Sequence, residues 1–284
     1  MNGKSVKNWR RVILPAILLM IGLIVGAGLA ANAQRYAGTS AEGEAKAGTS
    51  AEALAKAAPS APAARTAQQL YDAAVRDAVF ADEDEIMPLV SLDKEDSQVT
   101  WNDAGDRVLL LTWNNYPDSY PAGETVTLEW GTVWAFTGWE IMDKYAEEAD
   151  TVTDWDMRLK QIIGFPPDSE HSTFTGIWVR PEDVRRPAYR TYPSADEMDT
   201  KFDEDADEDF KEWFDGNIIW SYFDSAYPWT RLGYTYDWAG NGTEYGLTEF
   251  LVNQGAEVEV AFTESTETFL SRLAGGGDSS ALYK

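Results

Sequence analysis

The chain contains no cysteine at all, and it has a single histidine, His171. The absence of thiols excludes disulfide bonds, thiol catalysis, cysteine-ligated zinc and iron–sulfur clusters. One histidine excludes every metal site that needs several histidine ligands. His171 itself is a candidate general base, because an imidazole exchanges its proton near neutral pH, although a surface loop residue beside Glu170 is the simpler interpretation.

Basic residues are scarce: 23 Lys and Arg stand against 48 Asp and Glu, which gives a formal net charge of −25. A nucleic-acid partner is therefore not predicted, because phosphates require stripes of basic side chains. Hydrophobic residues make up 44% of the chain, enough for a real core, so a wholly disordered chain is excluded. No motif for a bound cofactor is present, and none is predicted.

One long segment lacks charge altogether: residues 12–31, which follow a basic start that contains Arg10 and Arg11. A helix of about 20 residues rises about 30 Å, the thickness of the hydrocarbon core of a bilayer. The basic flank is expected to stay in the cytoplasm while the rest of the chain crosses. The segment therefore predicts a single-pass protein of the cell membrane, with the C-terminal domain outside the cytoplasm and the membrane as a partner.

Residues 1–33 also fit a cleaved signal peptide, because Ala31-Asn32-Ala33 has the small-x-small pattern of a signal-peptidase site. Cleavage after Ala33 would give a secreted protein. The uncleaved anchor is favoured, because cleaved signals have apolar stretches of only about 7–15 residues. Both alternatives place the remainder outside the cytoplasm.

Residues 34–65 form an Ala-rich linker with a near-repeat, AGTSAEGEAK at 37–46 and AGTSAEALAK at 47–56. Such a segment cannot bury enough apolar surface to offset the entropy of ordering, so it predicts a flexible spacer. A helix over about 66–81 and an acidic connector are expected in residues 66–96. The glycine-rich end, residues 274–284, predicts a flexible tail.

Residues 97–273 are expected to form a single compact α+β domain with a mainly antiparallel sheet. Helical spacing of apolar residues predicts helices, and short apolar or alternating runs predict strands. Asn241-Gly242 marks a hairpin. Strands and helices are mixed without regular βαβ alternation, which favours α+β. The expected helices are 138–149, 155–163, 209–215 and 266–273, and the expected strands are 108–113, 126–130, 132–136, 173–179, 234–238, 245–252 and 257–262.

Several strings are highly individual, above all YPWTRLGYTYDW at 227–238, together with segments 116–121, 154–161 and 178–187. On these strings the chain resembles an uncharacterised group of exported or membrane-anchored bacterial proteins. The resemblance covers roughly residues 105–262. It carries no established activity and implies a bacterial source and one compact domain.

A second, shorter resemblance lies between Arg231 and Val260, where Arg231-Leu232-Gly233 is followed by Glu244-Tyr245-Gly246. This segment resembles the NAD glycohydrolase domain of secreted necrotizing toxins. The resemblance implies that Arg231 holds a pyrophosphate, as a planar bidentate donor can. It also implies that Glu244 or Glu249 stabilises the ribosyl cation. The alternative is a hairpin with an ion-paired arginine.

The acidic stretch 196–215 contains Asp203, Asp205 and Asp207 at the 1-3-5 spacing of a calcium loop. The glycine and the closing glutamate of such a loop are replaced by Glu208 and Phe214. No metal site is therefore predicted, and a solvated loop that leads into a helix N-terminus is favoured. These three aspartates stay the candidate ligands for Ca²⁺.

Aromatic residues are concentrated between residues 220 and 238, and the candidate ligand-binding residues are Trp229, Tyr234, Tyr236 and Trp238. Exposed rings could stack on sugars of a wall polymer, whereas the competing interpretation places them in the core. Carboxylate pairs suited to glycoside chemistry are abundant, but so many acids produce pairs by chance. The candidates include Glu140, Asp154, Asp156, Asp183 and Asp237.

The function predicted first is a binding or interaction module at the bacterial cell envelope, with an envelope polymer or a protein as its partner. One alternative is an NAD glycohydrolase or ADP-ribosyl hydrolase-like enzyme, and the other binds or trims envelope glycan. The exposure of the candidate residues distinguishes these functions. A hydrolase needs Arg231 and a carboxylate to converge in a concave pocket, and binding needs an open aromatic face.

Overall fold

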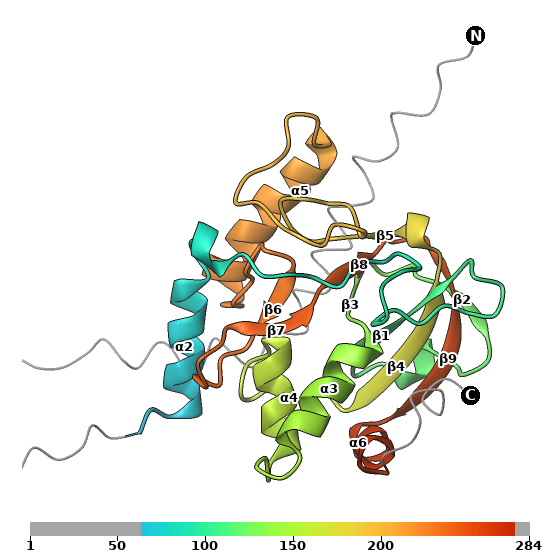
Figure 1. The fold of residues 1–284 in the computed structure, drawn as a ribbon, viewed down its shortest axis with the longest axis horizontal. Helices are drawn as coiled ribbons and strands as arrows, with labels where there is room; N and C mark the ends of the chain where they lie inside the picture. The colour runs from blue at the N-terminus through green and yellow to red at the C-terminus, as the bar shows by residue number, and fades with distance from the viewer. Residues whose placement is uncertain (1–63, 276–284) are drawn as a thin grey trace, which may run out of the picture. The chain divides into compact units, whose positions relative to one another are not determined.

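The computed structural model describes residues 64–275 (Figure 1). The predicted membrane segment 12–31, the linker up to residue 63 and the tail from residue 276 lie outside the described residues. Within residues 64–275, no helix has both the length and the apolar character needed to cross a membrane. The described chain from Arg65 onward belongs to one unit.

The largest sheet has four antiparallel strands in the order β1-β4-β9-β2, namely β1 (Val108–Asn114), β4 (Thr173–Val179), β9 (Glu257–Ser265) and β2 (Thr125–Thr127). Every residue of β1 is buried, which explains why this strand is a continuous apolar run in the sequence. The first residues of β9 alternate between exposed and buried, as expected of a strand with one face on the core.

Two smaller sheets complete the strand structure. One has the order β3-β8-β5, formed by β3 (Val133–Ala135), β8 (Phe250–Val252) and β5 (Val184–Arg185). The other is the hairpin of β6 (Tyr234–Tyr236) and β7 (Tyr245–Thr248). All named strand pairs are antiparallel, which confirms the predicted α+β class with mainly antiparallel sheets.

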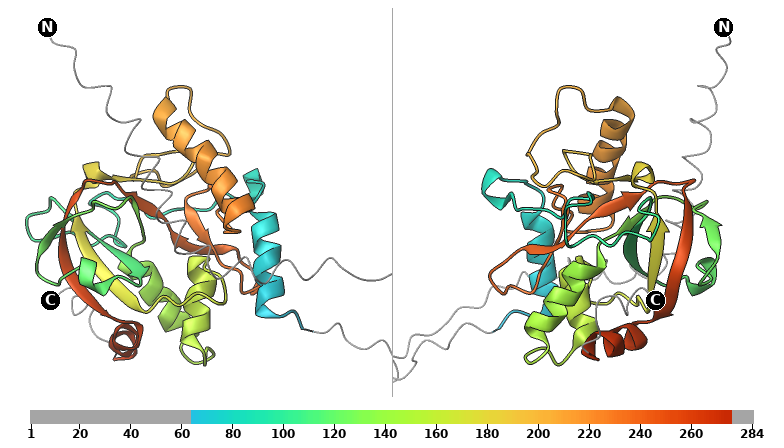
Figure 2. Two further views of the ribbon diagram at one scale, coloured as in Figure 1. Left: turned by 180° about the vertical axis from the view of Figure 1, so that it is seen from behind. Right: turned by 45° about the vertical axis from the view of Figure 1, so that its right-hand side comes forward.

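Within residues 64–275, five α-helices pack around these sheets, and α5 lies at the opposite side of the unit from α6 (Figure 2). The helices are α2 (Ala67–Asp77), α3 (Gly138–Glu148), α4 (Trp155–Ile163), α5 (Glu208–Ile219) and α6 (Thr266–Ala274). Short helical turns are η3 (Glu83–Glu85), η4 (Pro117–Ser119), η5 (Pro181–Asp183) and the π-turn η6 (Trp220–Asp224).

Local sequence explains where several helices begin and end. Thr66 forms a capping box with Gln69 at the start of α2. The side chain of Asp154 caps α4, accepting from the backbone N–H of Met157. Gly164 ends α4 in the left-handed conformation at φ 78°, which a glycine adopts without strain.

The hydrophobic core has two large parts. The first lies between the strands of the two larger sheets and includes Val108, Ile177 and Phe250. The second lies where α3, α4 and α6 cover one end of the main sheet and includes Leu159 and Phe269. Burying one side chain of this size stabilises the folded state by roughly 1.5–3 kcal/mol. These two clusters therefore hold in place the elements that the surrounding loops connect.

Helix α2 packs directly onto the β6–β7 hairpin (Figure 1). Tyr71 and Ala74 on α2 are buried against Tyr236 and Trp238, and the rings of Tyr71 and Trp238 meet edge to face at 5.6 Å. The helical segment that precedes the predicted domain boundary at residue 97 is therefore part of a shared core.

Several elements differ from the predicted bounds by a few residues at their ends, and two further differences change the fold. The run 245–252 is not one strand: it changes sheet at Glu249, whose backbone N–H donates to the carbonyl of Gly233. The helix predicted over 209–215 begins at Glu208 and continues to Ile219 before the π-turn. The break at Glu249 comes with a contact to a distant residue, which local periodicity does not report.

Candidate functional site

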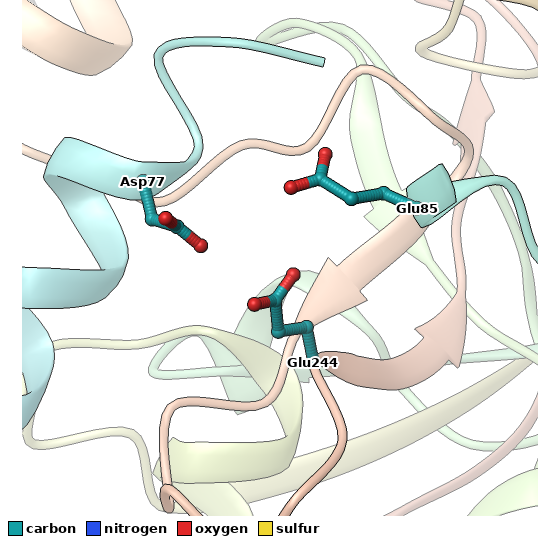
Figure 3. Close-up of side chains that lie close together, drawn as sticks. All are labelled: Asp77, Glu85 and Glu244. Atoms are coloured by element: carbon teal, nitrogen blue, oxygen red, sulfur yellow. The ribbon is translucent and has the colours of Figure 1, made fainter. Parts of the chain in front are cut away.

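Three carboxylates from distant parts of the chain point toward one another at the edge of the β6–β7 hairpin (Figure 3). They belong to Asp77 at the end of α2, Glu85 in η3 and Glu244 just before β7. One oxygen of each lies within 4.8 Å of the others. Among residues 64–275, none of these three carboxylates forms an ion pair with a basic side chain.

Two tyrosines of β6 hold this cluster in place. The hydroxyl of Tyr236 donates to Asp77 Oδ2 at 2.7 Å, and the hydroxyl of Tyr234 donates to the backbone carbonyl of Glu85 at 2.9 Å. Burial and the neighbouring charge of Asp77 raise the pKa of Glu244. Burial also raises the pKa of Glu85. The negative charges of the three carboxylates therefore repel one another in the folded state.

Oxygen donors of this kind are ligands for hard divalent cations such as Ca²⁺ or Mg²⁺. A proton relieves the same repulsion, so the cluster by itself does not identify an ion. Its direct consequence is electrostatic: the chain holds three acids together without a compensating base.

We expect Glu244→Gln to raise the melting temperature at pH 7 in a chelator-containing buffer, because it removes one of three opposed charges. The gain should be within about 1 kcal/mol, since the carboxylates are partly exposed. Glu83→Gln is the matched control, because Glu83 is exposed and lies outside the cluster. A lower melting temperature for Glu244→Gln than for Glu83→Gln would contradict the repulsion.

A cavity of about 280 Å³ is lined by residues that are close in sequence to the carboxylate cluster, and we call it the α3–β7 cavity. Glu85 is followed by two residues that line it, and Glu244 immediately precedes a third. The lining residues are Met87, Pro88, Gln98, Glu140, Asp143, Lys144, Glu147, Tyr245 and Gly246. Most of the lining is polar, and Met87 and Pro88 give it an apolar wall.

Glu140 is the most deeply buried carboxylate of the cavity, with 6% of its surface exposed. Its oxygens accept from the Tyr245 hydroxyl at 2.6 Å, from the backbone N–H and hydroxyl of Thr248, and from the Thr137 hydroxyl. Burial raises the pKa of Glu140, and these hydrogen bonds partly offset that shift. Glu140 therefore fastens α3 to β7 and fixes the ring of Tyr245.

Arg186 lies behind Glu140 and is fully buried. Its guanidinium donates to the backbone carbonyls of Val90, Pro193 and Ala195. It lies 4.8 Å from the ring centre of Phe250. Burial lowers the pKa of Arg186 to about 10, and the charge of Glu140 acts in the opposite direction.

The rim of the cavity belongs to α3. Asp143 and Glu147 are exposed, and Gln98 Nε2 lies 3.5 Å from Asp143 Oδ2. Lys144 Nζ lies 3.5 Å from the backbone carbonyl of Tyr245. The sequence held a signal for this rim, because positions i, i+3, i+4 and i+7 of a helix share one face. Glu140, Asp143, Lys144 and Glu147 have that spacing.

Arg231 occupies a different place from the one that the toxin resemblance implies. It is 7% exposed, and its guanidinium donates to the carbonyls of Val79 and Ala78 and to the Tyr189 hydroxyl. It therefore binds the chain just after α2 and does not line the α3–β7 cavity. Its backbone is left-handed, at φ 62°, a conformation that non-glycine residues rarely adopt.

The carboxylates implied by the same resemblance are separated. Glu244 lies in the carboxylate cluster, whereas Glu249 lies between β7 and β8. Glu249 Oε2 is inaccessible and has no hydrogen-bond partner among the described residues. Neither carboxylate forms an ion pair with Arg231 within residues 64–275. Asp237 is instead held by Arg158.

His171 has aromatic rather than acid–base surroundings. Its ring stacks on Phe165 at 4.1 Å and lies 5.5 Å from the ring of Trp113, and its Nδ1 contacts the Ser169 hydroxyl. Burial lowers the pKa of His171 to about 4, so the ring is neutral at pH 7.

The four candidate ligand-binding aromatics are buried, which corrects the prediction that they could form an open face. Tyr234 and Tyr236 hold the carboxylate cluster through their hydroxyls. Trp238 Nε1 donates to two backbone carbonyls, and Trp229 Nε1 donates to the carbonyl of Pro187. Their rings pack in the core: Tyr236 and Trp238 lie against α2, and Trp229 lies against α5.

The three candidate Ca²⁺ ligands also do not form a cluster. Asp207 caps α5, accepting from the backbone N–H of Phe210 at 2.8 Å. Asp203 and Asp205 do not come within ligand distance of it, since the one acidic group with metal-ligand spacing in residues 64–275 is the carboxylate cluster. The helix that begins at Glu208 uses Asp207 as a cap, not as a ligand.

Comparison with protein-family models, with curated proteins and with solved structures finds no match to this chain. The geometry of the described residues is therefore the basis for a functional assignment.

Proposed function

We propose that this chain is a binding module of the bacterial cell envelope that takes its ligand in the α3–β7 cavity. Residues 12–31 anchor it in the cell membrane, and residues 64–275 lie outside the cytoplasm. The uncharged run with its basic flank supports this placement. An envelope polymer is the proposed partner.

The observation that carries the proposal is the cavity itself. It brings polar groups from three segments together beside a small apolar wall, which gives a ligand several hydrogen-bond partners at once. Its inner wall is fixed, because the hydrogen bonds of Glu140 lock α3, Thr248 and Tyr245 together. A fixed wall favours binding, since little conformational freedom is lost when a ligand enters.

The chemistry of the inner residues favours binding over hydrolysis. Both oxygens of Glu140 already accept hydrogen bonds from the protein, which leaves this carboxylate poorly placed to move a proton to a substrate. Arg231, the implied pyrophosphate ligand of the alternative enzyme, is engaged with backbone carbonyls.

Co-sedimentation with isolated, insoluble cell-wall polymer tests the proposal, with the full chain solubilised in a nonionic detergent. We expect the wild-type chain to sediment with the polymer. The double variant Asp143→Lys, Glu147→Lys should stay largely in the supernatant, because two long side chains of opposite charge would occupy the rim.

Asp150→Lys is the matched control, because Asp150 is exposed just beyond α3 and does not line the cavity. It should sediment like the wild-type chain. Equal sedimentation of the wild type and the double variant, or no sedimentation of either, would overturn the proposal.

A further inference from the structure

Resting on the proposed function, we infer that the α3–β7 cavity recognises a primary ammonium group on an aliphatic stem. Such a group occurs on an amine-bearing side chain of a polymer and on a simple diamine. The inference concerns the class of ligand, which the presence of a cavity alone does not define.

The charges around the cavity favour a cation. Glu140 is buried, and both of its oxygens already accept hydrogen bonds from the protein. On the rim, the two negative charges of Asp143 and Glu147 are opposed by one positive charge, that of Lys144. The Lys144 ammonium lies toward the Tyr245 carbonyl, at 3.5 Å. An excess of negative charge therefore faces the cavity.

The carboxylate cluster adds to this field. Glu85 and Glu244 lie two residues before Met87 and one residue before Tyr245, and both of those residues line the cavity. An anionic ligand such as a pyrophosphate would meet these acids at short range. A cation is attracted by the same acids, and a net charge of −25 extends the attraction beyond the site.

The shape and chemistry of the lining fit an ammonium group with a short stem. The ammonium has three N–H donors, and the rim offers carboxylate oxygens and the Gln98 amide oxygen as acceptors. Tyr245 also lines the cavity, and its backbone carbonyl is a further acceptor. Met87 and Pro88 supply apolar surface for methylene groups. A volume of about 280 Å³ suits a small aliphatic amine better than a nucleotide.

Calorimetric titration of the full chain in nonionic detergent at low ionic strength tests the inference, with putrescine as the probe. Its matched control is 1,4-butanediol, which has the same length and carries hydroxyls in place of the ammonium groups. We expect putrescine to bind at one site and butanediol not to bind.

The variant Asp143→Asn, Glu147→Gln keeps the shape of the rim and removes its two negative charges. Each lost charge should weaken putrescine binding roughly two- to fivefold, as expected for exposed ion pairs. Asp150→Asn, which removes a charge outside the cavity, should bind putrescine like the wild type. Equal weakening by Asp150→Asn would overturn the inference, because the attraction would then belong to the whole acidic surface.

Failure of the inference is distinguishable from failure of the proposed function. If butanediol binds as well as putrescine, or if neither probe binds while the cell-wall polymer still sediments the wild type and not the rim variant, the cavity binds a ligand of another class. If the polymer also fails to distinguish the rim variant, the proposed function itself is overturned.

Discussion

Replacing Arg158 by methionine is expected to lower the free energy of unfolding by about 3–5 kcal/mol, the usual loss when one partner of a buried ion pair is removed. The guanidinium of Arg158 donates to both oxygens of Asp237 at 2.7 Å and to both oxygens of Glu148. Arg158 and Asp237 are both buried, so the variant leaves the aspartate charge without its partner. For a unit of this size the melting temperature should fall by about 10 °C.

Two further variants make this prediction specific. Glu208→Gln removes the more exposed i, i+3 pair with Lys211 on α5, and it should change stability by no more than about 0.5 kcal/mol. The double variant Arg158→Met, Asp237→Leu should recover much of the loss, because it leaves no buried charge unpaired. A thermal or urea unfolding curve for Arg158→Met that overlays the wild type would contradict the structural role of this pair.

Glu249→Gln is expected to stabilise the chain strongly at pH 8 and very little at pH 5. Burial raises the pKa of Glu249 to about 8, and its Oε2 has no hydrogen-bond partner among the described residues. Ionisation at this position therefore opposes folding. Each pKa unit corresponds to about 1.4 kcal/mol, so the penalty above pH 8 is on the order of a few kcal/mol.

The direction of the pH dependence follows from the number of protons bound to the folded and to the unfolded chain. Between the ordinary glutamate pKa of 4.5 and about 8, folded Glu249 holds a proton that the unfolded chain has lost. The free energy of unfolding therefore falls as the pH rises through this window and levels off above it. The glutamine variant lacks this slope, because its side chain is neutral at every pH.

Urea unfolding of the wild type and of Glu249→Gln across this pH range measures the difference directly. Glu182→Gln is a suitable control, since Glu182 is an exposed glutamate in η5. A constant difference between wild type and Glu249→Gln from pH 5 to pH 9 would show that Glu249 is ionised in the folded chain throughout.

Much of the local structure was predictable from the sequence. The strand at 173–179 and the helix at 155–163 match β4 and α4. Their signals are local, since helical spacing, a capping aspartate and a closing glycine all lie within the element itself. The α+β class followed from the same patterns, because the order of elements excluded regular βαβ units.

The candidate site was less predictable because its sequence patterns fit more than one structure. The aromatic residues around Trp238 fit a binding face and a core equally well, and burial beneath α2 decided for the core. Glu140 was one carboxylate among many. Only its spacing with Asp143 and Glu147 on one helix face set it apart.

By itself the sequence determined that this protein does not use cysteine chemistry or multi-histidine metal sites, and where several of its helices and strands begin. The tertiary structure alone decided that Asp77, Glu85 and Glu244 meet, and that α3 and β7 enclose a cavity. The physical reason is that periodicity and capping depend on neighbours along the chain. Contacts between α2, η3 and β7 depend on how buried surfaces far apart in the sequence pack together.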